Sequence, residues 1–141
     1  MSDKSPKKPN IPEPDRFAFS TFIDALPDAI VIVDRNGRIV DLNIQAVGMF
    51  GYARTELLGE QVEVLLPERV RSRHVGERGR YNQSPHVRPM GSGMNLFARR
   101  KDGQEFPVEV SLGPYQSADG PLVVSAIRDL SGRQRVWHEP E

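Results

Sequence analysis

Apolar residues at helical spacing mark the first element that this chain predicts. They recur at positions i, i+3, i+4 and i+7, which is the stripe of an amphipathic helix. The stripe consists of Phe19, Phe22, Ile23 and Leu26. Pro27 ends the pattern, because the residue before a proline is pushed out of the helical region. We expect a helix over residues 15–27, preceded by a disordered, proline-rich tail over residues 1–14.

The next apolar positions predict a hairpin followed by short helices. Residues 29–33 form a β-branched run that favours a buried strand. A turn ending in Asn36-Gly37 follows it, so residues 38–42 should return as the partner strand. Asn43 is then expected to cap a helix that Gly51 ends, and Thr55 to cap a second helix that Gly59 ends.

The last third of the chain predicts three more strands. Residues 94–99 should pair with a strand in which apolar and polar side chains alternate. The apolar set is Phe106, Val108, Val110 and Leu112. Pro107 has no N–H to donate to a ladder, which indicates an edge or bulged position. A turn at Asp119-Gly120 leads into a final strand over residues 122–127.

This order of elements predicts an α+β fold. A helix, two strands, several short helices and three strands suit a five-stranded antiparallel sheet with its short helices gathered on one face. We expect the globular domain over residues 28–131, with residues 132–141 as a linker or tail.

Composition limits the chemistry. The chain has 141 residues, enough for one domain, and equal numbers of basic and acidic residues give it no net charge. It has no cysteine, which excludes disulfides, thiolate metal sites and a cysteine nucleophile. The N-terminus lacks the apolar stretch of a signal peptide, and no window is apolar enough for a membrane span. We therefore expect a cytoplasmic protein.

Five short stretches, in order and with consistent gaps, resemble the PAS domains found ahead of histidine kinases and diguanylate cyclases. The resemblance covers roughly residues 20–132. The stretches are Leu26 to Ile30, Asp34 to Ile39, Phe50 to Gly59, Arg99 to Leu112 and Ile127 to Ser131.

The resemblance implies a sensory module. Such a module binds a small ligand or a partner protein and regulates an effector, such as a histidine kinase or another PAS-containing regulator, without catalysing a reaction itself. Related domains pair through their N-terminal helix, so a homodimer is expected with Phe19, Phe22, Ile23 and Leu26 in contact. Asp129, Leu130 and Ser131 resemble the terminal signal-coupling motif, whose aspartate commonly pairs with a basic residue. The chain ends soon after Gly132, so it acts in trans or is an excised module.

The fold of this family leaves a cavity between helices and sheet, which is the form that small-molecule sites take. Our candidate pocket residues share apolar character and expected positions on the sheet or its covering helices. They are Ile30, Ile32, Phe50, Leu58, Val62, Met90, Leu96, Val108, Val124 and Ala126. The alternative interpretation is that these residues are simply the core.

No cofactor follows from the sequence. Haem and flavin both stay open and neither is favoured. Some PAS oxygen sensors hold haem through a histidine before a Gly-x-Gly turn, but counting back from Gly91-Ser92-Gly93 places Arg88 at that position. His86 lies two residues earlier and is the candidate haem ligand, with a partly exposed loop histidine as the alternative. Trp137, the single tryptophan, lies in the expected tail and offers no flavin partner.

The segment over residues 69–93 carries six arginines against one acidic residue, Glu77. That excess is typical of an anion- or nucleic-acid-binding face, or of a solvated helix whose charges pair with acidic groups elsewhere. Few aromatic residues interleave and no recognition helix is visible, so we expect no nucleic-acid partner. The sequence has no phosphate loop, zinc signature or nucleophile elbow, and we expect no metal and no catalytic residue. The functions left open are a ligand sensor, a haem-based gas or redox sensor, and a ligand-free dimerisation or docking module.

Overall fold

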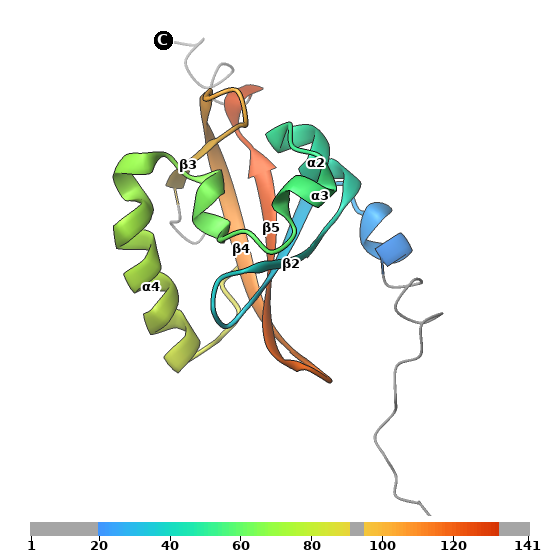
Figure 1. Cartoon of the computed structure of the whole chain (residues 1–141), viewed down its shortest axis with the longest axis vertical. Coiled ribbons are helices and arrows are strands. Elements are labelled where there is room, and N and C mark those ends of the chain that lie inside the picture. Colours follow the sequence, from blue (N-terminus) through green and yellow to red (C-terminus); the bar gives the residue numbers. More distant parts are fainter. Residues whose placement is uncertain (1–19, 91–94, 133–141) are drawn as a thin grey trace, which may run out of the picture.

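The sheet confirms the expected α+β architecture. A computed structural model describes residues 20–90 and 95–132 (Figure 1). The five strands are β1 (Ala29–Asp34), β2 (Ile39–Leu42), β3 (Asn95–Arg99), β4 (Glu105–Ser117) and β5 (Gly120–Asp129). All neighbouring strands are antiparallel, in the order β2-β1-β5-β4-β3. The expectations for the tail over residues 1–14, for Phe19, for residues 91–94 and for residues 133–141 lie outside the described residues.

Short helices connect the two halves of the sheet. They are α2 (Ile44–Phe50), α3 (Arg54–Leu57), the 3-10 turns η1 (Val62–Leu65) and η2 (Glu68–Val70), and α4 (Arg71–Gln83). These elements gather on one face of the sheet (Figure 1), which we call the inner face. A further helical turn over residues 20–24 packs on the opposite, outer face through Ile23.

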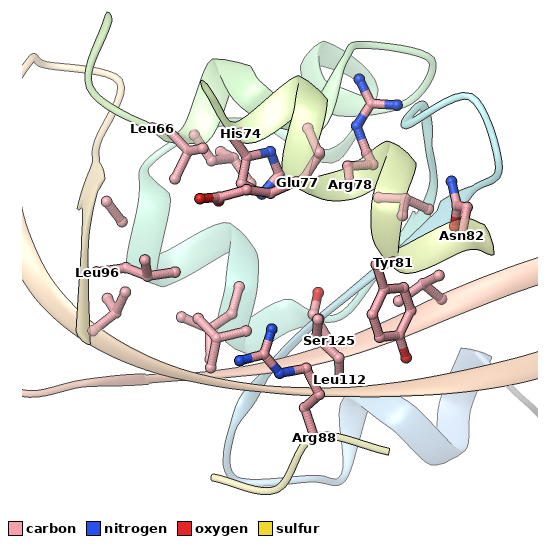
Figure 2. Close-up of a pocket in the computed structure, with 18 of the residues that line it drawn as sticks. Leu66, His74, Glu77, Arg78, Tyr81, Asn82, Arg88, Leu96, Leu112 and Ser125 are labelled. Carbon is pink, nitrogen blue, oxygen red and sulfur yellow. The ribbon is translucent and has the colours of Figure 1, made fainter. Parts of the chain in front are cut away.

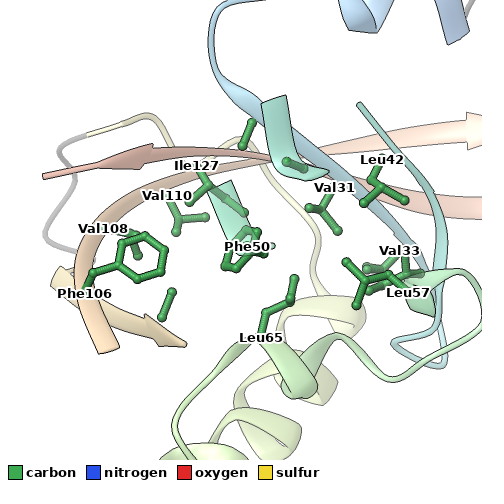
Figure 3. Packing of buried hydrophobic residues seen from close by; sticks show 14 residues of the cluster. Val31, Val33, Leu42, Phe50, Leu57, Leu65, Phe106, Val108, Val110 and Ile127 are labelled. Carbon is green, nitrogen blue, oxygen red and sulfur yellow. The ribbon is translucent and has the colours of Figure 1, made fainter. Parts of the chain in front are cut away.

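Side-chain alternation along β1 divides the core between the two faces. Val31 and Val33 belong to the inner cluster, where the tilted rings of Phe50 and Phe106 lie 5.8 Å apart between their centroids (Figure 3). Ile30 and Ile32 point the other way and form the outer cluster with Ile23. Period-two alternation puts neighbouring residues on opposite faces, so a strand that is apolar throughout serves both.

Asn43 joins three elements through one buried side chain. Its Oδ1 accepts hydrogen bonds from the backbone N–H groups of Ala46, at 3.0 Å, and Ile30, at 2.8 Å. The first of these caps α2 as the sequence predicts. Its Nδ2 donates to the carbonyl oxygens of Ile23, at 2.7 Å, and Asp28, at 3.0 Å. The start of α2, the start of β1 and the N-terminal helical turn are thus fixed to one another.

The hairpin between β1 and β2 forms at the expected turn. Gly37 adopts a φ of 80°, a conformation that favours glycine. It also lies directly beneath α4, and a Cβ at this position would collide with the guanidinium of Arg78. The turn and α4 are therefore in close contact.

Two local expectations are wrong. The N-cap of α3 is Ala53 and not Thr55, because the Glu56 carboxylate accepts from the Ala53 N–H at 2.7 Å and does the capping instead. Pro107 lies in an inner strand, opposite Phe97 of β3. It is tolerated there because the pairing of β4 with β5 begins only at the next residue, Val108. On that side Pro107 uses only its carbonyl, which accepts from the Leu130 N–H at 2.9 Å.

The four hydrogen bonds of Asn43 predict a large effect of its removal. Asn43→Ala should lower the free energy of unfolding by at least about 2 kcal/mol, because each buried polar group that loses its partner costs about 1–3 kcal/mol. Urea unfolding followed by circular dichroism measures this change. Asn36→Ala, at an exposed position in the β1–β2 turn, is the matched control and should change the free energy little. Equal effects of the two substitutions would contradict this role for Asn43.

Candidate functional site

A cavity of about 600 Å³ lies between α4 and the inner face of the sheet (Figure 2). Apolar side chains of β3, β4 and β5 form its floor, whereas α4 provides a polar roof. The floor residues are Leu96, Ala98, Val108, Val110, Leu112, Val123 and Ile127. The roof residues on α4 include His74, Glu77, Arg78, Tyr81 and Asn82.

The structure brings together only part of the residue set that the sequence suggested. Phe50, Val62, Leu96 and Val108 line the cavity. Leu58 is 38% exposed, and Met90 is half-buried but not part of the lining.

The other four candidate residues lie on the outer face, away from this cavity. Ile30 pairs with Ala126 and Ile32 with Val124, and all four belong to the outer cluster. Their neighbours Ser125 and Ile127 line the cavity in their place. The sequence could not predict which residues of β1 and β5 face the cavity, because both strands carry apolar side chains on both faces.

Sequence reasoning missed the polar roof. Helix α4 has no buried residue, so it does not reach the sheet with apolar side chains. The arginine excess of this segment was the available signal, but it does not show which side chains face the sheet.

A buried carboxylate holds α4 in place. Glu63 of η1 is 5% exposed, and its Oε2 lies 2.5 Å from His74 Nδ1 and 2.9 Å from Arg78 Nε. His74 and Arg78 are four residues apart, so both lie on the same side of α4. Arg71 adds a hydrogen bond from Nε to the Leu66 carbonyl at 3.0 Å. These polar contacts attach α4 to the segment over residues 62–66, because α4 has no buried apolar side chain that could do so.

The same contacts determine the ionisation of Glu63. Burial alone would raise the pKa of its carboxyl, but the hydrogen bonds from Arg78 and His74 outweigh burial and hold the pKa below its ordinary value of 4.5. The carboxylate is therefore ionised at neutral pH and pairs with Arg78.

Other arginines of the segment pair as the solvated-helix interpretation expects. Arg69 Nη1 lies 2.8 Å from Glu105 Oε2, and Arg73 Nε lies 3.7 Å from Glu77 Oε2. The local excess of positive charge is thus partly neutralised by acidic residues.

Arg88 enters the cavity from the segment after α4. Its N–H and carbonyl pair with the carbonyl and N–H of Leu112 at 2.8 and 2.9 Å, as an isolated antiparallel bridge. Directly opposite residues in such a pair project to the same face. Figure 2 shows the Arg88 guanidinium directed into the cavity above the sheet.

The two histidines that the structure describes both line the cavity, and each has its Nδ1 engaged by another group. His74 is engaged by Glu63. His86 is exposed at the edge of the cavity, with Nδ1 2.9 Å from the Ser84 carbonyl oxygen, and its own carbonyl accepts from the Tyr81 hydroxyl. Among the described residues, no cluster of histidine and carboxylate side chains could hold a metal ion.

The predicted signal-coupling motif forms a compact network at the end of β5. Asp129 Oδ1 accepts from the Ser131 N–H at 2.8 Å and from its hydroxyl at 2.6 Å, while Oδ2 lies 3.3 Å from Arg100 Nη2. Burial raises the pKa of Asp129, but these hydrogen bonds outweigh it and the net shift is downward. The Arg100 guanidinium also lies 3.7 Å from the centroid of the Phe106 ring.

The N-terminal stripe divides between core and solvent. Ile23 is 3% exposed against the outer face, and Leu26 is partly buried beside it. Phe22 is 60% exposed. Across the described residues, no helix combines the length and apolar character that a membrane span requires.

Comparison with known proteins places this geometry in a family. Residues 18–130 match the sequence profile of the PAS fold. The chain is 33% identical over 118 residues to the Sensor protein FixL of Bradyrhizobium diazoefficiens, a match that covers 82% of this chain and 23% of that protein. It is 23% identical over 101 residues to the Oxygen sensor protein DosP of Escherichia coli, covering 72% of this chain and 13% of that protein.

A solved structure gives the same fold. The PAS domain of a protein from Colwellia psychrerythraea superposes with a TM-score of 0.69 at 21% identity, covering 84% of this chain and 98% of that one.

The chain spans less than a quarter of the length of the curated relatives that it matches.

The attachment of α4 by Glu63 predicts a pH-dependent effect. Glu63→Gln should lower the free energy of unfolding by about 1–3 kcal/mol at pH 7, because a charge-assisted pair is lost. The ionised carboxylate stabilises the folded state, so its contribution is complete above the ordinary pKa of 4.5 and is lost as the pH falls through the lowered pKa of the folded protein. The difference between wild type and variant should therefore shrink in acid, as thermal unfolding from pH 7 downward can measure.

Glu77→Gln provides the matched control on the same helix. Its carboxylate is exposed and 3.7 Å from Arg73, so its loss should matter little at any pH. Parallel pH profiles for wild type and Glu63→Gln would rule out the attachment role.

Proposed function

Because the chain belongs to the PAS fold family, we propose that it is a sensory module which binds a small molecule in the cavity beneath α4 and passes that event to an effector. The cavity carries the proposal, since its apolar floor, polar roof and volume are those of small-molecule sites. PAS domains are non-catalytic modules, and the relatives named as sensor proteins support a role in signalling.

Strand β5 is the route by which binding would be transmitted. Val123, Ser125 and Ile127 line the cavity, and the strand ends two residues later at Asp129. Arg100 links Asp129 to the carbonyl of Met49 at the end of α2. A ligand that shifts β5 would thus act directly on the Asp129–Ser131 network, which we propose as the point of contact with the effector. We propose a histidine kinase as the effector, as the resemblance of the sequence to PAS domains found ahead of such kinases implies.

Haem is a second candidate, favoured by the relative named as an oxygen sensor. The described residues do not fit it, because Arg88 stands at the position that such sensors give to the iron-binding histidine and His86 is exposed at the edge of the cavity. The guanidinium of Arg88 is always protonated and cannot bind iron. His86 would have to leave its contact with the Ser84 carbonyl and turn inward.

Binding in the cavity can be tested with the neutral fluorophore N-phenyl-1-naphthylamine, which becomes fluorescent in apolar surroundings. Wild type should enhance its emission saturably. Val123→Trp, which fills the cavity, should abolish the enhancement, whereas Val124→Trp, one residue on and on the outer face, should not. Equal binding by both variants, or no binding by wild type, would contradict the proposed site.

An absorption spectrum of the freshly purified protein shows whether it carries haem or flavin. A stoichiometric Soret band that His86→Ala removes and His74→Ala leaves would favour the haem sensor. A flavin band would favour a flavin-based redox sensor.

We also propose that two copies pair through the N-terminal helical turn. Phe22 is 60% exposed beside the buried Ile23, and a two-fold contact would cover it. This pairing suits the sensory role and equally suits a ligand-free docking module, in which the cavity stays unused.

Phe22→Glu should therefore reduce the solution mass from dimer to monomer while the circular dichroism of the folded state is kept. Light scattering measures the mass. Phe97→Glu, which changes an equally apolar residue 49% exposed on β3, is the control and should remain dimeric. A monomeric wild type would end the dimer proposal for this chain.

A further inference from the structure

We propose that the cavity selects a small monocarboxylate with an apolar body and that Arg88 is the anchor for its carboxylate. This inference rests on the proposed ligand-binding function and specifies the class of molecule that the site takes. It follows from the position of Arg88, from the state of the other polar groups around the cavity, and from the charges on its walls.

The position of Arg88 is set by the sheet. Its backbone bridge to Leu112 continues a row across the inner face, since Leu112 pairs with Ser125 and Ser125 with Val31. The guanidinium therefore projects over an apolar floor, and the residue is half-buried (Figure 2). Burial raises the pKa of the Tyr81 hydroxyl and the positive charge of Arg88 opposes that rise, as expected for two groups that face the same space.

Most other polar groups of the cavity already have partners. Arg78 and His74 bind Glu63, and the Tyr81 hydroxyl donates to the His86 carbonyl. The Ser125 hydroxyl donates to the Val31 carbonyl at 2.8 Å. Asn82 Nδ2 donates to the Arg35 carbonyl at 3.0 Å.

Arg88 differs from these groups. No side chain among residues 20–90 and 96–132, and no carbonyl of the described backbone, accepts a hydrogen bond from its guanidinium. Arg80 also lines the cavity without such a partner, but it is exposed on α4. A cation over an apolar floor without a counter-charge is unfavourable, so an anionic ligand group would satisfy both its charge and its donors.

The charges on the walls favour a single negative charge. Asp34 and Glu77 line the same cavity and would repel a second one. Arg78 cannot offset that repulsion, because Glu63 already neutralises it. A carboxylate matches the planar fork of one guanidinium with two parallel hydrogen bonds, whereas a doubly charged phosphate would lack a second cation in the interior.

The floor defines the rest of the ligand. Leu96, Val108, Val110 and Leu112 present aliphatic side chains on the side away from the roof. An alkyl or aryl body that lies on this floor would bury apolar surface while its carboxylate reaches Arg88.

Isothermal titration with three probes of equal chain length tests the inference on the full chain. Octanoate, 1-octanol and octylammonium share an alkyl chain and differ in charge. Wild type should bind octanoate at least about tenfold more tightly than octanol, as expected for a charge-assisted pair, and octylammonium most weakly. Arg88→Gln should reduce octanoate affinity to that of octanol and leave octanol binding unchanged.

Two further variants separate charge from geometry. Arg88→Lys keeps the charge but loses the planar fork, so it should retain only part of the octanoate preference. Arg80→Gln removes an exposed cation from the edge of the cavity and should keep the full preference. Unchanged binding of N-phenyl-1-naphthylamine by Arg88→Gln serves as the check that the cavity remains folded.

The outcomes distinguish this inference from the function on which it rests. Equal affinity for octanoate and octanol, or octanoate binding that survives Arg88→Gln, overturns the role of Arg88 while the cavity remains a ligand site. The inference also fails if the neutral fluorophore binds and octanoate does not. If no probe binds wild type, the proposed ligand site is wrong, and the inference falls with it.

Discussion

The ion pair between Glu63 and Arg78 is the interaction on which the rest of this site depends. Helix α4 has no buried residue, so apolar packing cannot bring it down onto the sheet. Glu63, nearly buried in η1, holds it by a charge-assisted contact to Arg78 and a second contact to His74. A helix that brought apolar side chains to this place would fill the space above β4 and β5. A polar helix held by a polar contact leaves that space open, and the cavity is the result.

The same contact reaches the opposite half of the sheet. Arg78 lies against Gly37 at the tip of the β1–β2 hairpin, where a side chain would displace the guanidinium. Asn43 in turn fixes the start of β1 to α2 and to the N-terminal helical turn. Roof, hairpin and outer-face helix are therefore connected through two buried polar side chains. Polar networks of this kind specify one arrangement because each member loses a partner if another moves.

Most of the fold could be predicted from the sequence, because turns and alternation are local properties. The Asn36-Gly37 turn, the Asn43 cap and the alternation from Phe106 to Val110 all take their expected places. The site could be predicted only in part. Ile30, Ile32, Val124 and Ala126 were assigned to the cavity, but β1 and β5 carry apolar side chains on both faces, so the apolar pattern does not show which face a residue occupies. The partners of Glu63 and the bridge of Arg88 to Leu112 join segments 11 to 24 positions apart in sequence, and no local pattern reveals them. Arg88 stands in sequence at a position typical of a metal-binding histidine. Only the fold shows it as a cation at the cavity without a hydrogen-bond partner among the described side chains.

The apolar floor beneath α4 has a consequence for folding as well as for binding. Its leucine and valine side chains face a cavity of about 600 Å³ and lack the covering layer that completes an ordinary core. A molecule that fills this space supplies that layer and binds only the folded state, so its binding stabilises the fold. Each tenfold rise in free ligand above its dissociation constant then adds about 1.4 kcal/mol to the free energy of unfolding. Under such mass action the cellular lifetime of the protein would follow the concentration of any molecule that occupies this cavity.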